Sequence, residues 1–169
     1  MLEIINNLKP FFEDCYRRIS VREYAKLIKV SPPKSSKLLY YFNREGLLKK
    51  EKYRNYLFFY ANINSKEFTD LSRLYWYGRL KDFLSYLEKK LVNPAIILFG
   101  SLSKAEAKKD SDIDLSIFAH KKELNLESFE KKLGRKVQIF WFKSIADIKD
   151  KELANNIVNG YLLRGNLIF

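Results

Sequence analysis

The chain has 169 residues, 47% of them hydrophobic and 15% aromatic, and a formal net charge of +12. This size and apolar content suffice for one ordinary domain or two small ones, and the low counts of glycine (6) and proline (4) exclude a low-complexity chain. No apolar run approaches the roughly 18 residues that span a bilayer, no leader pattern opens the chain, and the single cysteine excludes an internal disulfide, so a soluble, cytoplasmic protein without membrane partners is expected.

The positive charge lies mainly in the first third of the chain. Residues 1–62 hold 13 Lys/Arg and 6 Asp/Glu, which gives a net charge of +7 for this segment. A basic, tyrosine-rich segment is typical of proteins that bind a polyanion such as nucleic acid. A lysine-rich surface that only keeps the protein soluble is the alternative.

Two helices are expected at the start of the chain. Apolar side chains recur at helical spacing and predict an amphipathic helix over residues 2–18. Cys15 falls on the apolar stripe and is expected to be a buried core residue. Ser20 followed three residues later by Glu23 is a helix-capping pattern, so a second helix is expected directly after it.

A third helix is expected over Lys34–Glu45. Pro32 and Pro33 suit its first turn, where a missing N–H does no harm, and Gly46 ends it. The expected elements after this helix are a strand from Leu47, a basic turn over 49–55 and a return strand over 56–61. This order is typical of a winged helix-turn-helix, and the segment resembles the winged helices of prokaryotic transcription regulators.

Polar side chains face outward from the third helix and from the basic turn, or wing. A helix of this size fits the major groove, and the wing can reach the phosphate backbone, so double-stranded DNA is the expected partner. A winged helix that contacts another protein is the alternative. The candidate DNA-binding residues are Lys34, Ser35, Lys37, Tyr41 and Arg44 on the helix and Lys50, Lys52 and Arg54 on the wing.

A long connector helix is expected after the wing. Ser65 is suited to cap it, and Asn93-Pro94 ends it. Its aromatic residues Trp76 and Tyr77 are expected to pack in a core or an interface. A long apolar helix between two domains is also a candidate surface for a homodimer, because winged-helix regulators often pair their recognition helices on one site.

The residues that carry chemistry come after the connector. The apolar run Ala95–Phe99 predicts a buried strand that ends in Gly100-Ser101, and 112–118 predicts a half-buried strand that carries Asp112 and Asp114 on one face. Two carboxylates at this spacing can hold Mg²⁺ while substrate phosphates complete its shell. Gly100 lets a phosphate approach the backbone, Ser101 can hydrogen-bond it, and Lys104 one turn later can face it.

The spacing Gly-Ser, ten residues, Asp-x-Asp resembles the signature of the DNA polymerase β-like nucleotidyltransferases, and most of all the minimal nucleotidyltransferases of bacteria and archaea. The resemblance covers residues 94–169. It implies a small α/β domain on a mixed sheet that uses Mg²⁺ (or Mn²⁺) and ATP or another nucleoside triphosphate. It also implies transfer of a nucleotidyl group, AMP first, to a hydroxyl of a small molecule or of a protein acceptor such as a toxin partner.

One position departs from the family pattern. The family carries a third carboxylate on a later strand, where it helps bind metal and activates the attacking hydroxyl, but Gln138 stands there in this chain. An amide has no charge and cannot act as a base. Two alternatives to an enzyme therefore remain: a nucleotide-sensing transcription regulator with an impaired transferase domain, and an antitoxin that neutralises a partner by contact.

The expected fold class is α+β. The expected domains are a winged helix-turn-helix over 1–62, a connector helix over 63–93 and a nucleotidyltransferase-like domain over 94–169. The last domain is expected to end in a helix over 152–158, an extended segment over 161–163, and a turn at Gly165-Asn166 before 167–169.

Overall fold

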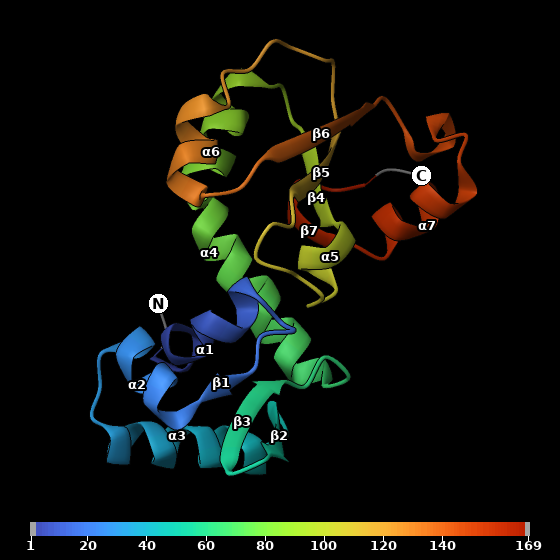
Figure 1. Cartoon of the computed structure of the whole chain (residues 1–169). Helices are drawn as coiled ribbons and strands as arrows, with labels where there is room; N and C mark the ends of the chain where they lie inside the picture. Colours follow the sequence, from blue (N-terminus) through green and yellow to red (C-terminus); the bar gives the residue numbers. More distant parts are fainter. Residues whose placement is uncertain (1–2, 168–169) are drawn as a thin grey trace. The chain divides into compact units, whose positions relative to one another are not determined.

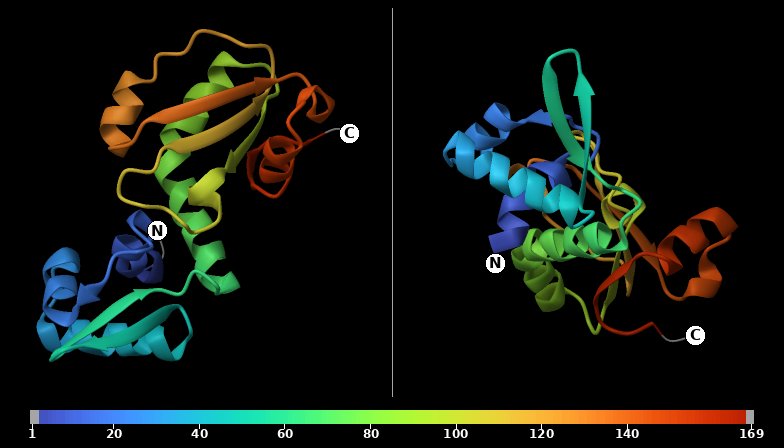
Figure 2. Two further views of the ribbon diagram at one scale, coloured as in Figure 1. Left: turned by 45° about the vertical axis from the view of Figure 1, so that its right-hand side comes forward. Right: turned by 90° about the horizontal axis from the view of Figure 1, so that it is seen from below.

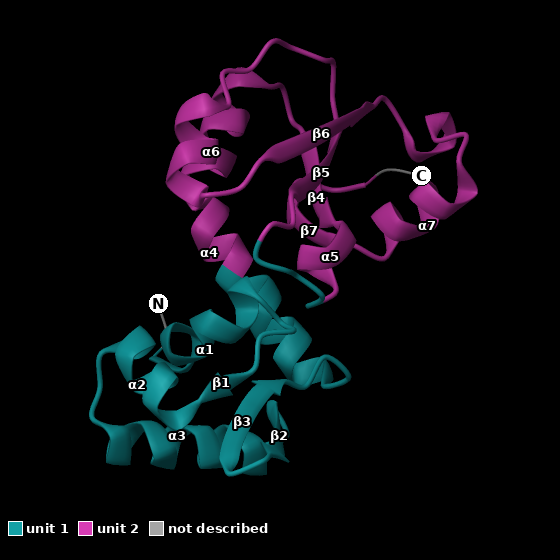
Figure 3. Ribbon diagram, in the orientation of Figure 1, with its two compact units in different colours: residues 1–75, 105–109 teal, residues 76–104, 110–169 magenta. Residues whose placement is uncertain are grey.

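The computed structural model describes residues 3–167 and contains helices, one antiparallel sheet and one mixed sheet. The chain forms two compact units (Figure 3). Unit 1 comprises the residues up to Tyr75 together with Ala105–Lys109, and unit 2 comprises Trp76–Lys104 and the residues from Asp110 onward. Across residues 3–167, no helix combines the length and the hydrophobicity that a membrane crossing requires.

Unit 1 joins three helices to a small antiparallel sheet. The sheet has the strand order β1-β3-β2, with Ile19 opposite Phe59 and Leu48 opposite Ala61. The elements in chain order are α1 (Glu3–Glu13), β1 (Ile19–Ser20), α2 (Val21–Ile28), α3 (Pro32–Arg44), β2 (Leu48–Tyr53) and β3 (Tyr56–Ala61), followed by the first part of α4 (Lys66–Lys90) (Figure 1).

The expected helix over 2–18 is wrong over residues 14–18, and its residue 2 lies outside the described residues. Helix α1 ends at Glu13. The Asp14 carboxylate then accepts from the Tyr16 N–H (3.1 Å), and the Cys15 N–H donates to the Ala107 carbonyl (2.8 Å) rather than continuing the helix. Ile19 is buried, but it belongs to β1. Its position in the apolar pattern therefore indicated burial correctly and a helix wrongly.

The starts of α2 and α3 agree closely with the sequence. The Ser20 hydroxyl accepts from the Glu23 N–H (3.3 Å), as the capping pattern predicts, while the Glu23 carboxylate pairs with Arg17 (2.6 Å). Helix α3 begins with Pro32 and Pro33 and therefore starts two residues earlier than expected. The apolar sides of these helices, with α1, bury the core of unit 1, which includes Phe11, Phe12, Tyr24, Leu39, Phe42, Phe59 and Phe68.

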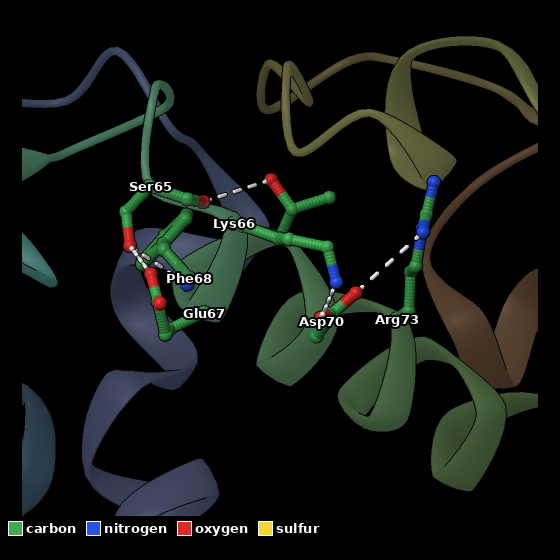
Figure 4. Close-up of polar contacts among 7 residues, drawn as sticks. Ser65, Lys66, Glu67, Phe68, Asp70 and Arg73 are labelled. Atoms are coloured by element: carbon green, nitrogen blue, oxygen red, sulfur yellow. Dashed lines mark hydrogen bonds and ion pairs between the residues drawn. The ribbon is translucent and has the colours of Figure 1, made fainter.

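Helix α4 runs without interruption for 25 residues. As expected, Ser65 caps it, because its hydroxyl accepts from the Phe68 N–H (3.2 Å) and donates to the Glu67 carboxylate (2.9 Å) (Figure 4). One turn later Asp70 lies between Lys66 (3.3 Å) and Arg73 (3.6 Å) (Figure 4). The Ser65 contact satisfies one of the free N–H groups of the first turn, which the helix itself leaves without a partner.

Unit 2 is built on a four-stranded mixed sheet with the order β6-β5-β4-β7, in which only β5 and β6 are parallel. The second half of α4 and helix α6 lie on one face, and α7 lies on the other (Figures 1 and 2). The elements are β4 (Ala95–Phe99), α5 (Gly100–Ser103), β5 (Ile113–Phe118), α6 (Glu127–Leu133), β6 (Val137–Phe142), the 3₁₀ turn η1 (Ile145–Asp147), α7 (Lys151–Val158) and β7 (Tyr161–Arg164).

The expected alternation of buried and exposed side chains along β5 fails because both faces of the sheet are packed. Ile113, Leu115 and Ile117 are buried on one face, but Ser116 on the other face is also fully buried. That second face carries a cluster of Ile97, Phe99, Ile148 and Ile157, against which Phe140 and Leu153 pack. Strand β5 is thus a central strand, and the partly exposed Asp112 and Asp114 lie at its start.

Candidate functional site

The site begins where β4 ends and β5 starts. These strands are antiparallel, and Phe99 lies opposite Asp114, so the turn at Gly100 comes directly beside the Asp114 side chain. Gly100 has φ +69°, a conformation that side chains disfavour. A Cβ at this position would overlap Asp114 Oδ2 and lie 3.2 Å from its Cγ. A side chain here would therefore strain the backbone and displace the Asp114 carboxylate.

Asp112 and Asp114 form the acidic part of the site. Asp114 is half-buried, and burial, followed by the negative charge of Asp112, raises the pKa of the Asp114 carboxyl above its ordinary value. Both effects disfavour a second negative charge in the same place. A bound cation would offset both of them, so the pair is electrostatically suited to hold one.

The structure brings Gln138 to this pair. Strands β5 and β6 are parallel with Asp114 opposite Gln138, and the Gln138 Nε2 donates to Asp112 Oδ2 (2.8 Å). Position 138 thus lies where a third acidic side chain would complete the site. In this chain the amide presents an N–H to Asp112, which occupies one of the lone pairs that a metal would use.

The residues in and directly after α5 differ in their burial and in their partners. Ser101 is half-buried in the first turn of α5, and the Ser103 hydroxyl donates to the Gly100 carbonyl (2.9 Å) and closes that turn. Lys104 is exposed, and its Nζ donates to Asn156 Oδ1 of α7 (2.7 Å). The structure therefore places Lys104 at a contact with α7, a partner that nothing in the spacing of the motif indicated.

Arg135 is a contributor that sequence reasoning missed. It is 7% exposed, its guanidinium donates to the Ser111 carbonyl (2.5 Å), and it lies over the Trp76 ring at 5.0 Å from the ring centre. The hydrogen bond ties the start of β6 to the residue just before Asp112. In the sequence Arg135 is one of several basic residues around Gly134, and only its burial distinguishes it.

The donor set fits one Mg²⁺ when a triphosphate brings the remaining ligands. Within residues 3–167, no group of three His, Cys, Asp or Glu side chains is arranged to hold a metal by itself. Mg²⁺ is commonly held by one or two carboxylates plus substrate phosphates, which is what Asp112 and Asp114 offer. A second metal does not fit, because Gln138 brings an amide N–H where another carboxylate oxygen would be needed.

The basic face predicted on unit 1 is largely exposed, with one error. Ser35 is fully buried, and its hydroxyl donates to the Val21 carbonyl at the start of α2 (2.7 Å). The prediction that Ser35 donates to phosphate is therefore wrong, because this position of α3 faces α2. The remaining candidates are exposed: Lys34, Lys37, Tyr41 and Arg44 on α3, and Lys50, Lys52 and Arg54 on the β2–β3 hairpin.

The mixed sheet, the glycine with positive φ after β4 and the aspartate pair beside it are consistent with a nucleotidyltransferase-type domain. The family model described as "Polymerase beta, Nucleotidyltransferase" matches residues 81–166, half of the chain, and the chain belongs to this family. The match begins within α4, before the first strand of the sheet. Comparison with curated proteins found no match, and comparison with solved structures found none.

Proposed function

We propose that unit 2 binds a nucleoside triphosphate, ATP first, as its Mg²⁺ complex. The observation that carries this proposal is the Gly100 turn packed against Asp114, with Asp112 and Gln138 on the same side of the sheet. Asp112 and Asp114 hold the metal, and the Gly100-Ser101 backbone lets the phosphates approach. When bound, the metal neutralises charge on the phosphates and aligns them for displacement.

Transfer of the nucleotidyl group to a hydroxyl is the first candidate for the step after binding. Family membership supports it, and AMP is the group we expect. The acceptor is a Tyr or Ser of a partner protein or a small-molecule hydroxyl. The acceptor oxygen attacks the α-phosphate, the bond to the β-phosphate breaks, and pyrophosphate leaves. In this chain Gln138 can orient the acceptor but cannot remove its proton, which passes to water or to the phosphates.

Nucleotide sensing without turnover is the second candidate, and the Gln138–Asp112 hydrogen bond favours it. A glutamine that donates to a metal-binding carboxylate stabilises its position but supplies neither a base nor a ligand charge. In this version, binding of the triphosphate at unit 2 changes the DNA affinity of unit 1, and the protein acts as a transcription regulator.

Incubation of the full chain with α-labelled ATP, Mg²⁺ or Mn²⁺ and candidate acceptors decides between the two. Transferase activity predicts label on an acceptor, which Asp112→Asn with Asp114→Asn abolishes. Sensing predicts no label, but a higher melting temperature with Mg²⁺ and ATP that the same double variant loses. Gln138→Glu should then create or raise transfer. If nucleotide changes neither melting nor labelling, the binding proposal itself is wrong.

For unit 1 we propose a winged helix-turn-helix that binds double-stranded DNA. The order α2, α3, β2, β3 and the seven exposed basic and tyrosine side chains of α3 and the hairpin support it. Because phosphate contacts release counterions, affinity for duplex DNA should fall steeply with salt. Replacement of Lys37 and Lys52 by Ala should lower the salt slope by about one for each lost phosphate contact. A flat salt response would refute DNA binding by this face.

A further inference from the structure

A groove lies between the second half of α3 and strand β2 of unit 1. Its volume is about 560 Å³, and it is lined by Lys37, Tyr40, Tyr41, Asn43, Arg44 and Lys50. Three of these side chains are cationic, two are aromatic, one is an amide, and none is a carboxylate. The Asn43 amide already donates to the Leu48 carbonyl (2.8 Å), which fixes the floor of the groove between helix and strand.

Both tyrosine rings are partly exposed to solvent, and each contacts a buried aromatic ring. Tyr40 is 45% exposed, and its ring stands edge-on to the buried Phe59 with centres 5.5 Å apart. Tyr41 is 44% exposed, and its ring contacts the buried Phe42 with centres 5.6 Å apart. Rings held in this way lose little conformational entropy when a flat ligand stacks on them.

A cation accompanies each ring. Lys50 Nζ lies 5.0 Å from the centre of the Tyr40 ring, and the Arg44 guanidinium carbon lies 5.5 Å from the centre of the Tyr41 ring. The same pairing recurs at the tip of the hairpin, where Tyr53 is 61% exposed with Arg54 at 5.5 Å from its ring centre. Alternation of exposed aromatic rings and cations matches a ligand that alternates flat bases and phosphates.

The surrounding charge is complementary to phosphate. Residues 32–56 contain seven Lys/Arg and only two acidic residues. Both acids are already paired, Glu45 with Arg44 (3.4 Å) and Glu51 with Arg18 (2.7 Å). A polyanion therefore meets no uncompensated carboxylate along this face, and its attraction to the cations is not opposed.

We propose that this groove binds an unpaired nucleobase of single-stranded nucleic acid. Tyr41 stacks on the base, Tyr40 lines the groove beside it, and Lys37 and Lys50 contact the phosphates on either side of the base. In a duplex the faces of the bases are covered by their neighbours, and only phosphates and base edges are accessible. Exposed tyrosine rings cannot stack on bases inside a duplex, whereas base stacking on an aromatic side chain is worth about 1–3 kcal/mol per base.

This inference rests on the proposed binding of nucleic acid by unit 1. It makes single-stranded nucleic acid, rather than a duplex, the preferred ligand. The test measures binding of the full chain to labelled oligothymidylate and to a duplex of the same length by fluorescence anisotropy. The single strand should bind more tightly than the duplex. Tyr41→Ala should weaken single-strand binding by about 5- to 150-fold, the equivalent of one lost stacking contact. Duplex binding should change much less.

Two matched variants separate stacking from other effects. Tyr41→Phe keeps the ring and should keep the affinity, and Tyr16→Ala removes another tyrosine with half its surface exposed, outside the groove, and should change nothing. A strand with 2-aminopurine should show a fluorescence change on binding that Tyr41→Ala removes.

The inference is wrong if the duplex competes better than the single strand, or if the Ala and Phe variants behave alike. If the duplex binds with a steep salt dependence and the single strand does not, DNA binding by unit 1 stands and only this inference falls; if neither binds, both fall.

Discussion

Gly100→Ala tests whether the turn after β4 keeps Asp114 in its place. The substitution acts twice. At φ +69° an alanine costs about 1–2 kcal/mol of backbone energy. In addition, its Cβ would overlap Asp114 Oδ2, so the carboxylate must move from its position beside residue 100.

Gly134→Ala provides the matched control for the backbone effect. Gly134 has nearly the same conformation, φ +70°, but no atom lies within 4 Å of a Cβ built there. Its replacement should therefore cost only the backbone energy, which corresponds to a fall of about 2–8 °C in melting temperature for a chain of this size. Gly100→Ala should lower the melting temperature at least as far.

The two variants should differ in nucleotide binding. In the proposed complex Asp114 holds the metal, and loss of a group that positions a metal ligand typically costs about 10- to 100-fold in affinity. Gly100→Ala should therefore weaken binding of ATP with Mg²⁺ by about that factor. Isothermal titration calorimetry of both variants below their melting temperatures measures this. The reasoning would be refuted if Gly100→Ala bound the nucleotide as well as Gly134→Ala, because the glycine would then serve the backbone alone.

Single contacts predict three further outcomes. Because burial and then the charge of Asp112 raise the pKa of Asp114 in the folded state, the ionised carboxylate opposes folding, and stability should rise as pH falls through that pKa. In the presence of a chelator, Asp114→Asn should therefore be more stable than the unchanged protein at pH 7, and this difference should disappear below about pH 4. Urea titrations at several pH values measure the free energy of unfolding of both proteins. A difference in stability that does not depend on pH would contradict the prediction. Ser35→Ala removes the donor that lies 2.7 Å from the Val21 carbonyl and should destabilise unit 1 by about 1 kcal/mol without changing DNA affinity. Weaker binding at equal stability would place Ser35 on the ligand. Arg135→Lys loses the guanidinium contact with the Ser111 carbonyl and should weaken nucleotide binding by about tenfold in calorimetry, and full affinity would show that Ser111 needs no such support.

Local signals predicted most of the elements of unit 1. Ser20 caps α2, the proline pair opens α3, and Gly46 comes after its end, because each of these effects depends only on neighbouring backbone groups. The failures had a common cause. Ile19 and Ser35 are both buried by elements distant in sequence, Ile19 by pairing with β3 and Ser35 by packing at Val21. Periodicity predicts that a residue is buried or polar, but it does not say which partner lies opposite.

In the candidate site, too, local features could be predicted from the sequence, whereas contacts between distant segments could not. The spacing of Gly100 and the two aspartates predicts a turn beside an acidic strand, and the structure places Phe99 opposite Asp114 as this requires. The parallel pairing of β6 that brings Gln138 to Asp112 is a matter of strand order, which the sequence of either strand leaves open. The assignment of Ala105–Lys109 to unit 1 likewise depends on contacts such as the one between Cys15 and Ala107.

The sequence by itself determined the identity of the chemical groups: two carboxylates two residues apart, a glycine that tolerates positive φ, and an amide in place of a third acid. Only the tertiary structure decided their relations. It decided that Gly100 packs on Asp114, that Gln138 donates to Asp112, and that Lys104 pairs with Asn156. The reason is physical, since caps and turns form from interactions within a few residues, whereas hydrogen bonds between side chains of different strands and helices exist only once the sheet has assembled.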